Sequence, residues 1–136
     1  MYEIRAHTAD LEIHVEAASL EQLLAESGTA LFASIVENVE SVRSVKSVDF
    51  RISGCQPEYL LLDWLSELLF AFEKEHLLLR EFQVTVDQAG LSGSAQGEPY
   101  DVHRHHLQHE VKAITYHGLL VSQTNSGWTA DFIIDI

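Results

Sequence analysis

The chain is poor in positive charge and in cysteine. Its 136 residues include only 8 Lys and Arg against 21 Asp and Glu, which gives a formal net charge of −13 with histidine neutral. Such a chain repels polyphosphate, so we expect no direct binding of nucleic acid; a basic protein or a divalent cation is the more natural partner. The only cysteine, Cys55, excludes an intramolecular disulfide framework and a multi-cysteine zinc site, and it favours a reducing compartment.

Signals for membranes, secretion and domain linkers are also absent. The first residues lack a charged region followed by an apolar one, and the uncharged run 113–130 contains too many polar side chains and glycines to lie in hydrocarbon. Only two prolines occur, and no Pro/Gly/Ser-rich linker interrupts the chain. We therefore expect one domain over residues 1–136, in a cytoplasmic protein that does not associate with membranes.

Hydrophobic periodicity predicts a strand and then a helix near the start. Residues 10–17 alternate apolar and polar side chains, which is typical of a half-buried strand, and residues 2–6 predict a shorter strand before it. Ser19, followed by Gln22 at the spacing of a capping box, predicts the N-terminus of a helix over residues 20–37.

The rest of the chain predicts one more helix and several strands. Residues 45–53 indicate a strand, and Pro57 begins a second helix over residues 57–74 whose wide apolar stripe contains Trp64, which we assign to the core. Strand and hairpin patterns follow to the end of the chain, with turns at residues 88–90 and 125–127 and strand-like stretches at 82–86, 91–96, 111–116, 119–124 and 128–134. This order predicts an α+β fold, with antiparallel or mixed sheets and two helices packed together on one face.

Aspartates near the two ends of the chain form the first candidate site. If the first long strand and the last strand are neighbours, Asp10 and Asp135 converge, with Asp131 on the same strand face as Asp135. Two carboxylates at one point repel each other unless a proton or cation lies between them, and oxygen ligands favour Ca²⁺, Mg²⁺ or Mn²⁺ over zinc. Backbone oxygens and a terminal carboxylate at Ile136 are further possible ligands. The alternative is that these aspartates only solvate the strand ends.

Four histidines in residues 103–109 form the second candidate site. A helix would place His105 and His109 on one face, whereas a strand would place His103 and His105 together, so the two interpretations give different metal-ligand pairs. The alternative is a polar, solvent-exposed loop. A modest response to pH near the histidine reference pKa is also possible.

Lys112 is one of only three lysines, and it lies in an apolar stretch rich in β-branched residues. On the strand pattern it shares a face with Ile114 and Tyr116, where it either faces an acidic site or is an ordinary edge-strand charge. Nucleophilic catalysis has little support, because neither Cys55 nor any serine lies in a recognisable nucleophile motif.

Four segments together resemble the archease family. They are His-Thr-Ala-Asp-Leu-Glu-Ile at residues 7–13, Pro-Glu-Tyr-Leu-Leu-Leu-Asp-Trp-Leu-Ser-Glu-Leu-Leu at 57–69, Glu-Val-Lys-Ala-Ile-Thr-Tyr-His at 110–117, and the strand at 128–135. They occur in the family order and cover nearly the whole chain. The resemblance implies a compact α+β domain that is not an enzyme but an activator of the RtcB-type RNA-splicing ligase, increasing guanylylation and multiple turnover of that ligase in tRNA splicing and RNA repair.

The resemblance also implies a set of site residues. The family metal ligands fall on Asp10, Asp135 and Ile136, with Ca²⁺ the expected ion and Mg²⁺ or Mn²⁺ as alternatives, and an essential family lysine matches Lys112. It supports neither Asp131 nor the histidines of residues 103–109 as functional residues. Two alternative functions remain: a metal-dependent phosphoester hydrolase with Asp10 and Asp135 as ligands, and a general chaperone-like modulator.

Overall fold

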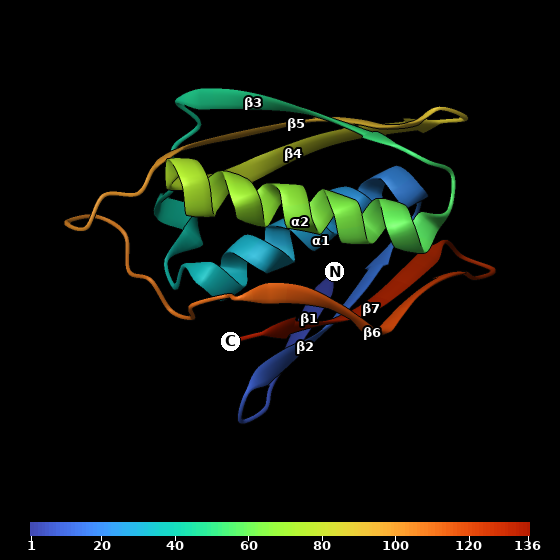
Figure 1. The fold of residues 1–136 in the computed structure, drawn as a ribbon, viewed down its shortest axis with the longest axis horizontal. Coiled ribbons are helices and arrows are strands. Elements are labelled where there is room, and N and C mark those ends of the chain that lie inside the picture. Colours follow the sequence, from blue (N-terminus) through green and yellow to red (C-terminus); the bar gives the residue numbers. More distant parts are fainter.

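The computed structural model describes residues 1–136 and shows two antiparallel sheets with both helices between them (Figure 1). The four-stranded sheet has the order β1-β2-β7-β6, and the three-stranded sheet has the order β3-β5-β4. The elements are β1 (Tyr2–Ala6), β2 (Asp10–Ala17), α1 (Leu20–Ile35), the 3₁₀ turn η1 (Val39–Ser41), β3 (Lys46–Ser53), α2 (Pro57–Glu75), β4 (Leu77–Asp87), β5 (Gly90–Pro99), β6 (Ala113–Gln123) and β7 (Trp128–Asp135).

The predicted α+β class, with antiparallel sheets and two helices packed together, is confirmed. Because the helices lie between the sheets, they cover one face of each and leave the other face to solvent (Figure 1). Neither helix combines the length and the apolar character that a membrane crossing requires.

Local signals place the helix ends. The Ser19 hydroxyl accepts a hydrogen bond from the Gln22 N–H at 3.1 Å, so the predicted N-cap is confirmed. Pro57 is the first residue of α2, and His76 ends that helix in the left-handed conformation with φ of 56°. The first helix ends at Ile35 rather than at residue 37, because Val36 already has extended backbone and bridges to Leu107.

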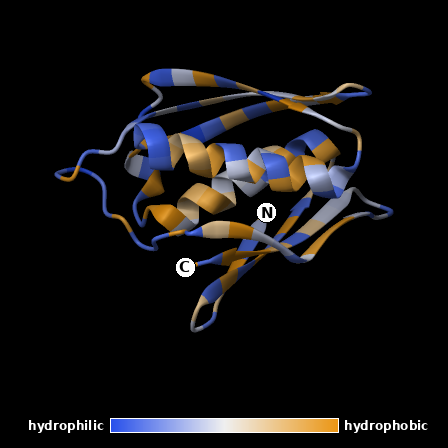
Figure 2. Ribbon diagram, viewed as in Figure 1, coloured by the Kyte–Doolittle hydropathy of each residue, from blue (hydrophilic) through white to orange (hydrophobic).

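The core fills the space between the sheets around α2. Trp64 is fully buried, its indole N–H donates to the Leu24 carbonyl of α1 at 2.8 Å, and its ring meets Phe50 of β3 edge-on at 5.4 Å. One side chain therefore joins both helices and the three-stranded sheet, and the assignment of Trp64 to the core is confirmed. Along the strands, hydrophobic residues alternate with hydrophilic ones, as expected for sheets with one covered face (Figure 2).

The predicted stretches 111–116 and 119–124 form one long strand, β6, with an irregularity in its middle. Pairing with β7 runs through Thr115–Ile133 and resumes at Leu120–Asp131, so residues 116–119 face Phe132 alone. The extra residues form a bulge on the outer strand of the sheet, with Gly118 at φ of 74°.

Candidate functional site

The antiparallel pairing of β2 and β7 places Asp10 directly opposite Asp135. Each backbone carbonyl points away from the other strand: that of Asp10 accepts from the His7 N–H at 2.9 Å, and that of Asp135 accepts from the Lys112 N–H at 2.8 Å. The two aspartates therefore form a non-hydrogen-bonded pair, the type in which side chains approach most closely, with Cβ atoms typically about 4.5–5.5 Å apart. The predicted meeting of the two chain ends is present in the fold.

No cationic side chain neutralises this pair. Asp135 is exposed and Asp10 is half-buried, and neither takes part in an ion pair. Two unit charges about 5 Å apart repel by about 1 kcal/mol in water and about 3 kcal/mol at the effective dielectric of a protein surface. Like charges directly opposite each other destabilise a sheet. The arrangement has a cost that a bound cation would remove.

The donors at this position suit a hard cation. Two carboxylates and the backbone oxygens near Ile136, whose N–H donates to the Ala9 carbonyl at 3.1 Å, supply only oxygen. Ca²⁺ takes six to eight oxygen ligands and accepts water among them, whereas zinc prefers nitrogen and sulfur. No group of three or more His, Cys, Asp or Glu side chains is arranged to hold an ion anywhere in the chain. A metal centre here would therefore need backbone oxygens and water to complete its shell.

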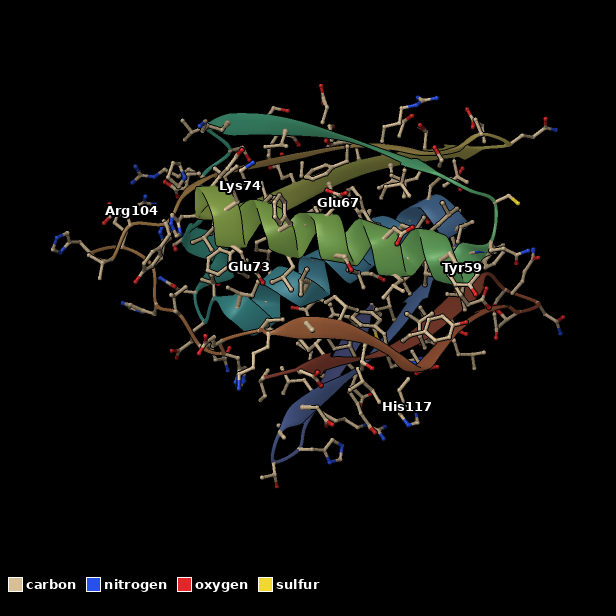
Figure 3. All side chains as sticks on the ribbon, in the orientation of Figure 1. Tyr59, Glu67, Glu73, Lys74, Arg104 and His117 are labelled. Atoms are coloured by element: carbon tan, nitrogen blue, oxygen red, sulfur yellow. The ribbon has the colours of Figure 1, made fainter.

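Lys112 lies immediately beside the aspartate pair along the backbone. Its N–H is bonded to Asp135, and the next residue, Ala113, is the cross-strand partner of Asp135 in β6. The Lys112 side chain is exposed and forms no ion pair. It lines a hollow of about 460 Å³ with Glu73 and other residues at the C-terminal end of α2, where Figure 3 labels Glu73. Lys112 precedes β6 rather than belonging to it, because the strand begins at Ala113.

Asp131 is on the same outer sheet face but is paired with a histidine. It lies opposite His14, and its carboxylate is 2.7 Å from the His14 Nδ1 atom. This hydrogen bond raises the pKa of His14, against the opposing effect of burial, and the charges of Asp131 and Glu16 add to the rise. A groove of about 570 Å³ lies beside this pair. Asp131 therefore does not join Asp10 and Asp135.

The histidines of residues 103–109 do not form a metal site. The segment is neither helix nor strand, so both predicted ligand pairs, His105 with His109 and His103 with His105, rest on the wrong local structure. The alternative of an exposed loop is correct for most of the segment, but His105 is buried. Its Nδ1 accepts from the Asp101 N–H at 2.9 Å, so Nε2 carries the proton that faces Glu98 at 3.1 Å.

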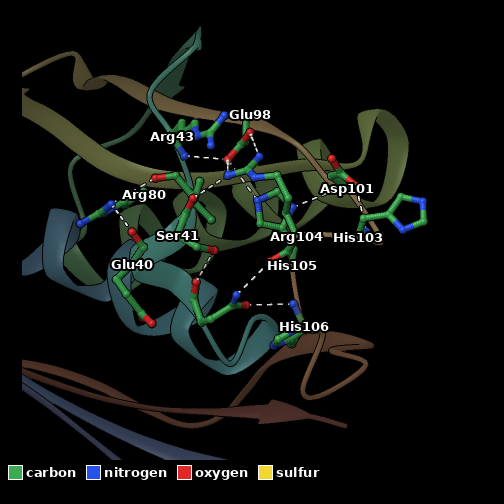
Figure 4. A network of polar contacts seen from close by, with 12 residues as sticks. Glu40, Ser41, Arg43, Arg80, Glu98, Asp101, His103, Arg104, His105 and His106 are labelled. Atoms are coloured by element: carbon green, nitrogen blue, oxygen red, sulfur yellow. Dashed lines mark hydrogen bonds and ion pairs between the residues drawn. The ribbon is translucent and has the colours of Figure 1, made fainter.

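The centre of this network is the buried carboxylate of Glu98 (Figure 4). Arg104 binds it with two hydrogen bonds of 2.6 and 3.0 Å, and the Arg43 N–H donates to it at 2.7 Å. Hydrogen bonds from Arg104 first, and then from the Arg43 backbone and His105, together lower the pKa of Glu98 to about 2, against the effect of burial. The network joins residues 98–106 to the chain after α1, and no sequence motif predicted it because its partners there, Ser41 and Arg43, lie far from Glu98 and Arg104 along the chain.

The chain is similar to known proteins over almost its whole length. The model of the Archease protein family matches residues 2–136. Curated relatives include the archease proteins of Methanopyrus kandleri (36% identical over 134 residues, 96% of this chain and 95% of the relative) and of Pyrococcus furiosus (36% over 135 residues, 96% and 94%). The solution structure of Methanobacterium thermoautotrophicum protein 1598 superposes with a TM-score of 0.86 at 28% identity, covering 99% of this chain and 98% of that one. The chain therefore belongs to the archease family.

Proposed function

We propose that this protein is a non-catalytic, cation-binding activator of an RtcB-type RNA-splicing ligase in the cytoplasm. In this role it promotes guanylylation and repeated turnover of the ligase in tRNA splicing and RNA repair. Family membership supports the general assignment. The observation that carries the cation-binding part is the uncompensated Asp10–Asp135 pair, with Lys112 bonded to the backbone beside it.

The aspartates and Lys112 have different roles in this proposal, because their charges are opposite. Asp10, Asp135 and the backbone oxygens at Ile136 would hold a hard cation, Ca²⁺ first and Mg²⁺ or Mn²⁺ as alternatives. The bound cation would supply an open coordination position for a phosphate oxygen. Lys112 contributes an exposed positive charge beside the pair, suited to contact with a nucleotide phosphate or with a carboxylate of the ligase. Positioning of charge near a phosphoryl group is a recognised source of rate acceleration in phosphoryl transfer.

The charge of the whole chain supports a protein partner rather than RNA. A net charge of −13 favours fast encounter with a basic, RNA-binding enzyme and opposes direct contact with a phosphate backbone. The site lies at one end of the two central strands of a sheet whose outer face is uncovered, so another protein can approach it without rearrangement of the fold (Figure 1).

A single-turnover guanylylation assay tests the proposal. The cognate ligase, GTP and Mn²⁺ are mixed with wild-type chain or with Asp135→Asn or Lys112→Ala, and the labelled enzyme–GMP adduct is followed in time. We expect the wild-type chain to accelerate adduct formation and each variant to lose most of that effect. Asp131→Asn is the control for Asp135→Asn, because it removes a carboxylate from the same strand away from the pair. Lys74→Ala is the control for Lys112→Ala, because it removes a lysine from an exposed helix position away from the pair. No acceleration by wild-type chain would refute the proposal.

The same preparations separate the alternative functions. Hydrolysis of phosphoesters by the chain alone, abolished by Asp10→Ala, would identify a metal-dependent hydrolase. Suppression of aggregation of unrelated proteins, unaffected by Asp135→Ala, would identify a general chaperone-like modulator.

A further inference from the structure

Two exposed tyrosine rings are stacked on each other where α2 begins. Tyr59 of α2 and Tyr116 of β6 have ring centroids 5.7 Å apart and planes inclined by 10°, and each side chain is 54% exposed. The neighbouring Tyr59 side chain raises the pKa of Tyr116, and the charge of Glu58, which precedes Tyr59 in the first turn of α2, adds to the rise. Tyr59 lies where α2 approaches the four-stranded sheet (Figure 3).

No other aromatic pair in the chain is exposed in this way. The remaining tryptophan, tyrosine and phenylalanine side chains are buried in the core or packed against it, except Phe70. Phe70 is partly covered by its own neighbour, the Lys74 ammonium group, 5.5 Å from the ring centre. The ring faces of Tyr59 and Tyr116 that point away from each other have no such cover from a cationic side chain of this chain.

The bulge of β6 makes the stack possible. Regular pairing with β7 breaks immediately after Thr115, and the extra residues 116–119 free Tyr116 from the ladder and bring it to the first turn of α2. A bulge on an outer strand commonly re-aims a side chain toward a functional surface. Ala113, the cross-strand partner of Asp135, is three residues before Tyr116, or about 10 Å along an extended strand. Tyr116 turns toward α2 on the helix side of the sheet, whereas Asp10 and Asp135 lie on the outer face, so the stack and the aspartate pair are separate parts of the surface.

The chemistry of this surface selects a cationic, planar group. Exposed tyrosine faces attract cations, and a guanidinium stacks on them better than an ammonium while also pairing with a carboxylate. Glu58, the residue before Tyr59 in the first turn of α2, provides that carboxylate, and the net charge of −13 opposes the phosphates that would accompany a stacked nucleobase. Stacked tyrosines are also rigid, so little conformational entropy is lost when a partner binds.

We propose that the Tyr59–Tyr116 stack, with Glu58, is a docking site for an arginine side chain of the protein partner. This inference rests on the proposed function for the identity of that partner, the ligase. The stack contributes affinity and orientation, and the aspartate pair acts once the partner is docked.

Affinity measured separately from activation tests the inference. The dissociation constant for the cognate ligase is measured by calorimetry for wild type, Tyr59→Ala, Tyr116→Ala, Tyr116→Phe and Phe70→Ala. We expect each tyrosine-to-alanine change to weaken binding about tenfold, while Tyr116→Phe, which keeps the ring, and Phe70→Ala stay within about twofold of wild type. Guanylylation at saturating chain should stay unchanged in Phe70→Ala, whose ring lies outside the stack. Wild-type affinity in both alanine variants would overturn the inference, and circular dichroism confirms that each variant is folded.

A second measurement needs no ligase, so the two proposals can fail independently. Nona-arginine and nona-lysine are each added to the chain alone, and the ring resonances of Tyr59 and Tyr116 are followed by NMR. We expect shifts with nona-arginine that greatly exceed those with nona-lysine and that are reduced in Glu58→Gln. Equal shifts with both peptides, or larger shifts with oligouridylate than with nona-arginine, would overturn the inference. If wild-type chain does not bind the ligase, the proposed function fails, and the peptide result alone decides whether the stack recognises arginine.

Discussion

Removal of one carboxylate from the Asp10–Asp135 pair should stabilise the fold when no divalent cation is present and destabilise it when one is bound. Asp10→Asn and Asp135→Asn keep the shape of the side chain and remove one of two facing charges. The repulsion is about 1–3 kcal/mol at the separation of a non-hydrogen-bonded pair, and the exposure of Asp135 favours the lower end. In EDTA we therefore expect each variant to be more stable than wild type by about 0.5–1 kcal/mol, which is a rise in Tm of about 2–5 °C for a chain of this size.

With a divalent cation the order should reverse. A ligand at 100 times its dissociation constant stabilises the folded state by about 2.7 kcal/mol, or about 10 °C in Tm here. Wild type gains this stabilisation, whereas a variant with one carboxylate loses most of it. The variants should thus melt above wild type in EDTA and below it in excess Ca²⁺.

Thermal unfolding followed by circular dichroism, with EDTA and then with Ca²⁺, measures this reversal. Asp131→Asn is the control: its carboxylate lies on the same sheet face but is paired with His14, so its stability relative to wild type should not change sign with metal. If Asp10→Asn and Asp135→Asn melt below wild type in EDTA, or if added Ca²⁺ leaves the order unchanged, the reasoning about an uncompensated carboxylate pair is wrong.

Three further outcomes follow from the same structure. Lys112→Ala should change the free energy of unfolding by less than about 0.5 kcal/mol, because the side chain is exposed and unpaired, yet it should abolish most ligase activation; urea unfolding and guanylylation assays check the two parts. Glu98→Gln should destabilise the fold by roughly 2–3 kcal/mol at pH 7. Because the folded-state pKa of Glu98 is lowered to about 2, the stabilisation by its carboxylate is present above about pH 4.5 and is lost as the pH falls toward 2. Urea unfolding across this range should show the stabilities of the two proteins converging. The pKa of His14, measured by NMR, should lie above 6.5 and return toward 6.5 in Asp131→Asn. Because the folded-state pKa is raised, the contribution of His14 to the free energy of unfolding is full below pH 6.5 and is lost as the pH rises through the folded-state pKa.

Local patterns predicted most of the secondary structure. The alternation at residues 10–17, the Ser19 cap and Pro57 each depend on a few neighbouring residues, and all three describe the structure correctly. The division into two predicted stretches, 111–116 and 119–124, also reflects a real break, because the pairing of β6 with β7 is interrupted between Thr115 and Leu120. A pattern shows where regular pairing ends, but it does not show that the strand continues beyond a bulge.

Features that depend on distant contacts were predicted only in part. Asp10 and Asp135 meet because β7 pairs with β2. Residue spacing alone does not establish that these two strands are neighbours. The exposed loop that the sequence allowed at residues 103–109 is correct except at His105, because residues 98–106 pack against the chain after α1 and bury this side chain beside Glu98. The Tyr59–Tyr116 stack was missed for the same reason: a helix start and a strand bulge meet only in the folded chain.

Paramagnetic broadening by Mn²⁺ tests the central claim most directly. Substoichiometric Mn²⁺ is added to isotopically labelled chain, and the loss of each backbone amide signal is measured. We predict that broadening is strongest at Asp10, Asp135 and Ile136, and that excess Ca²⁺ reverses it. Broadening centred on residues 103–109, or spread evenly over the acidic surface, would contradict a cation site between the two ends of the chain.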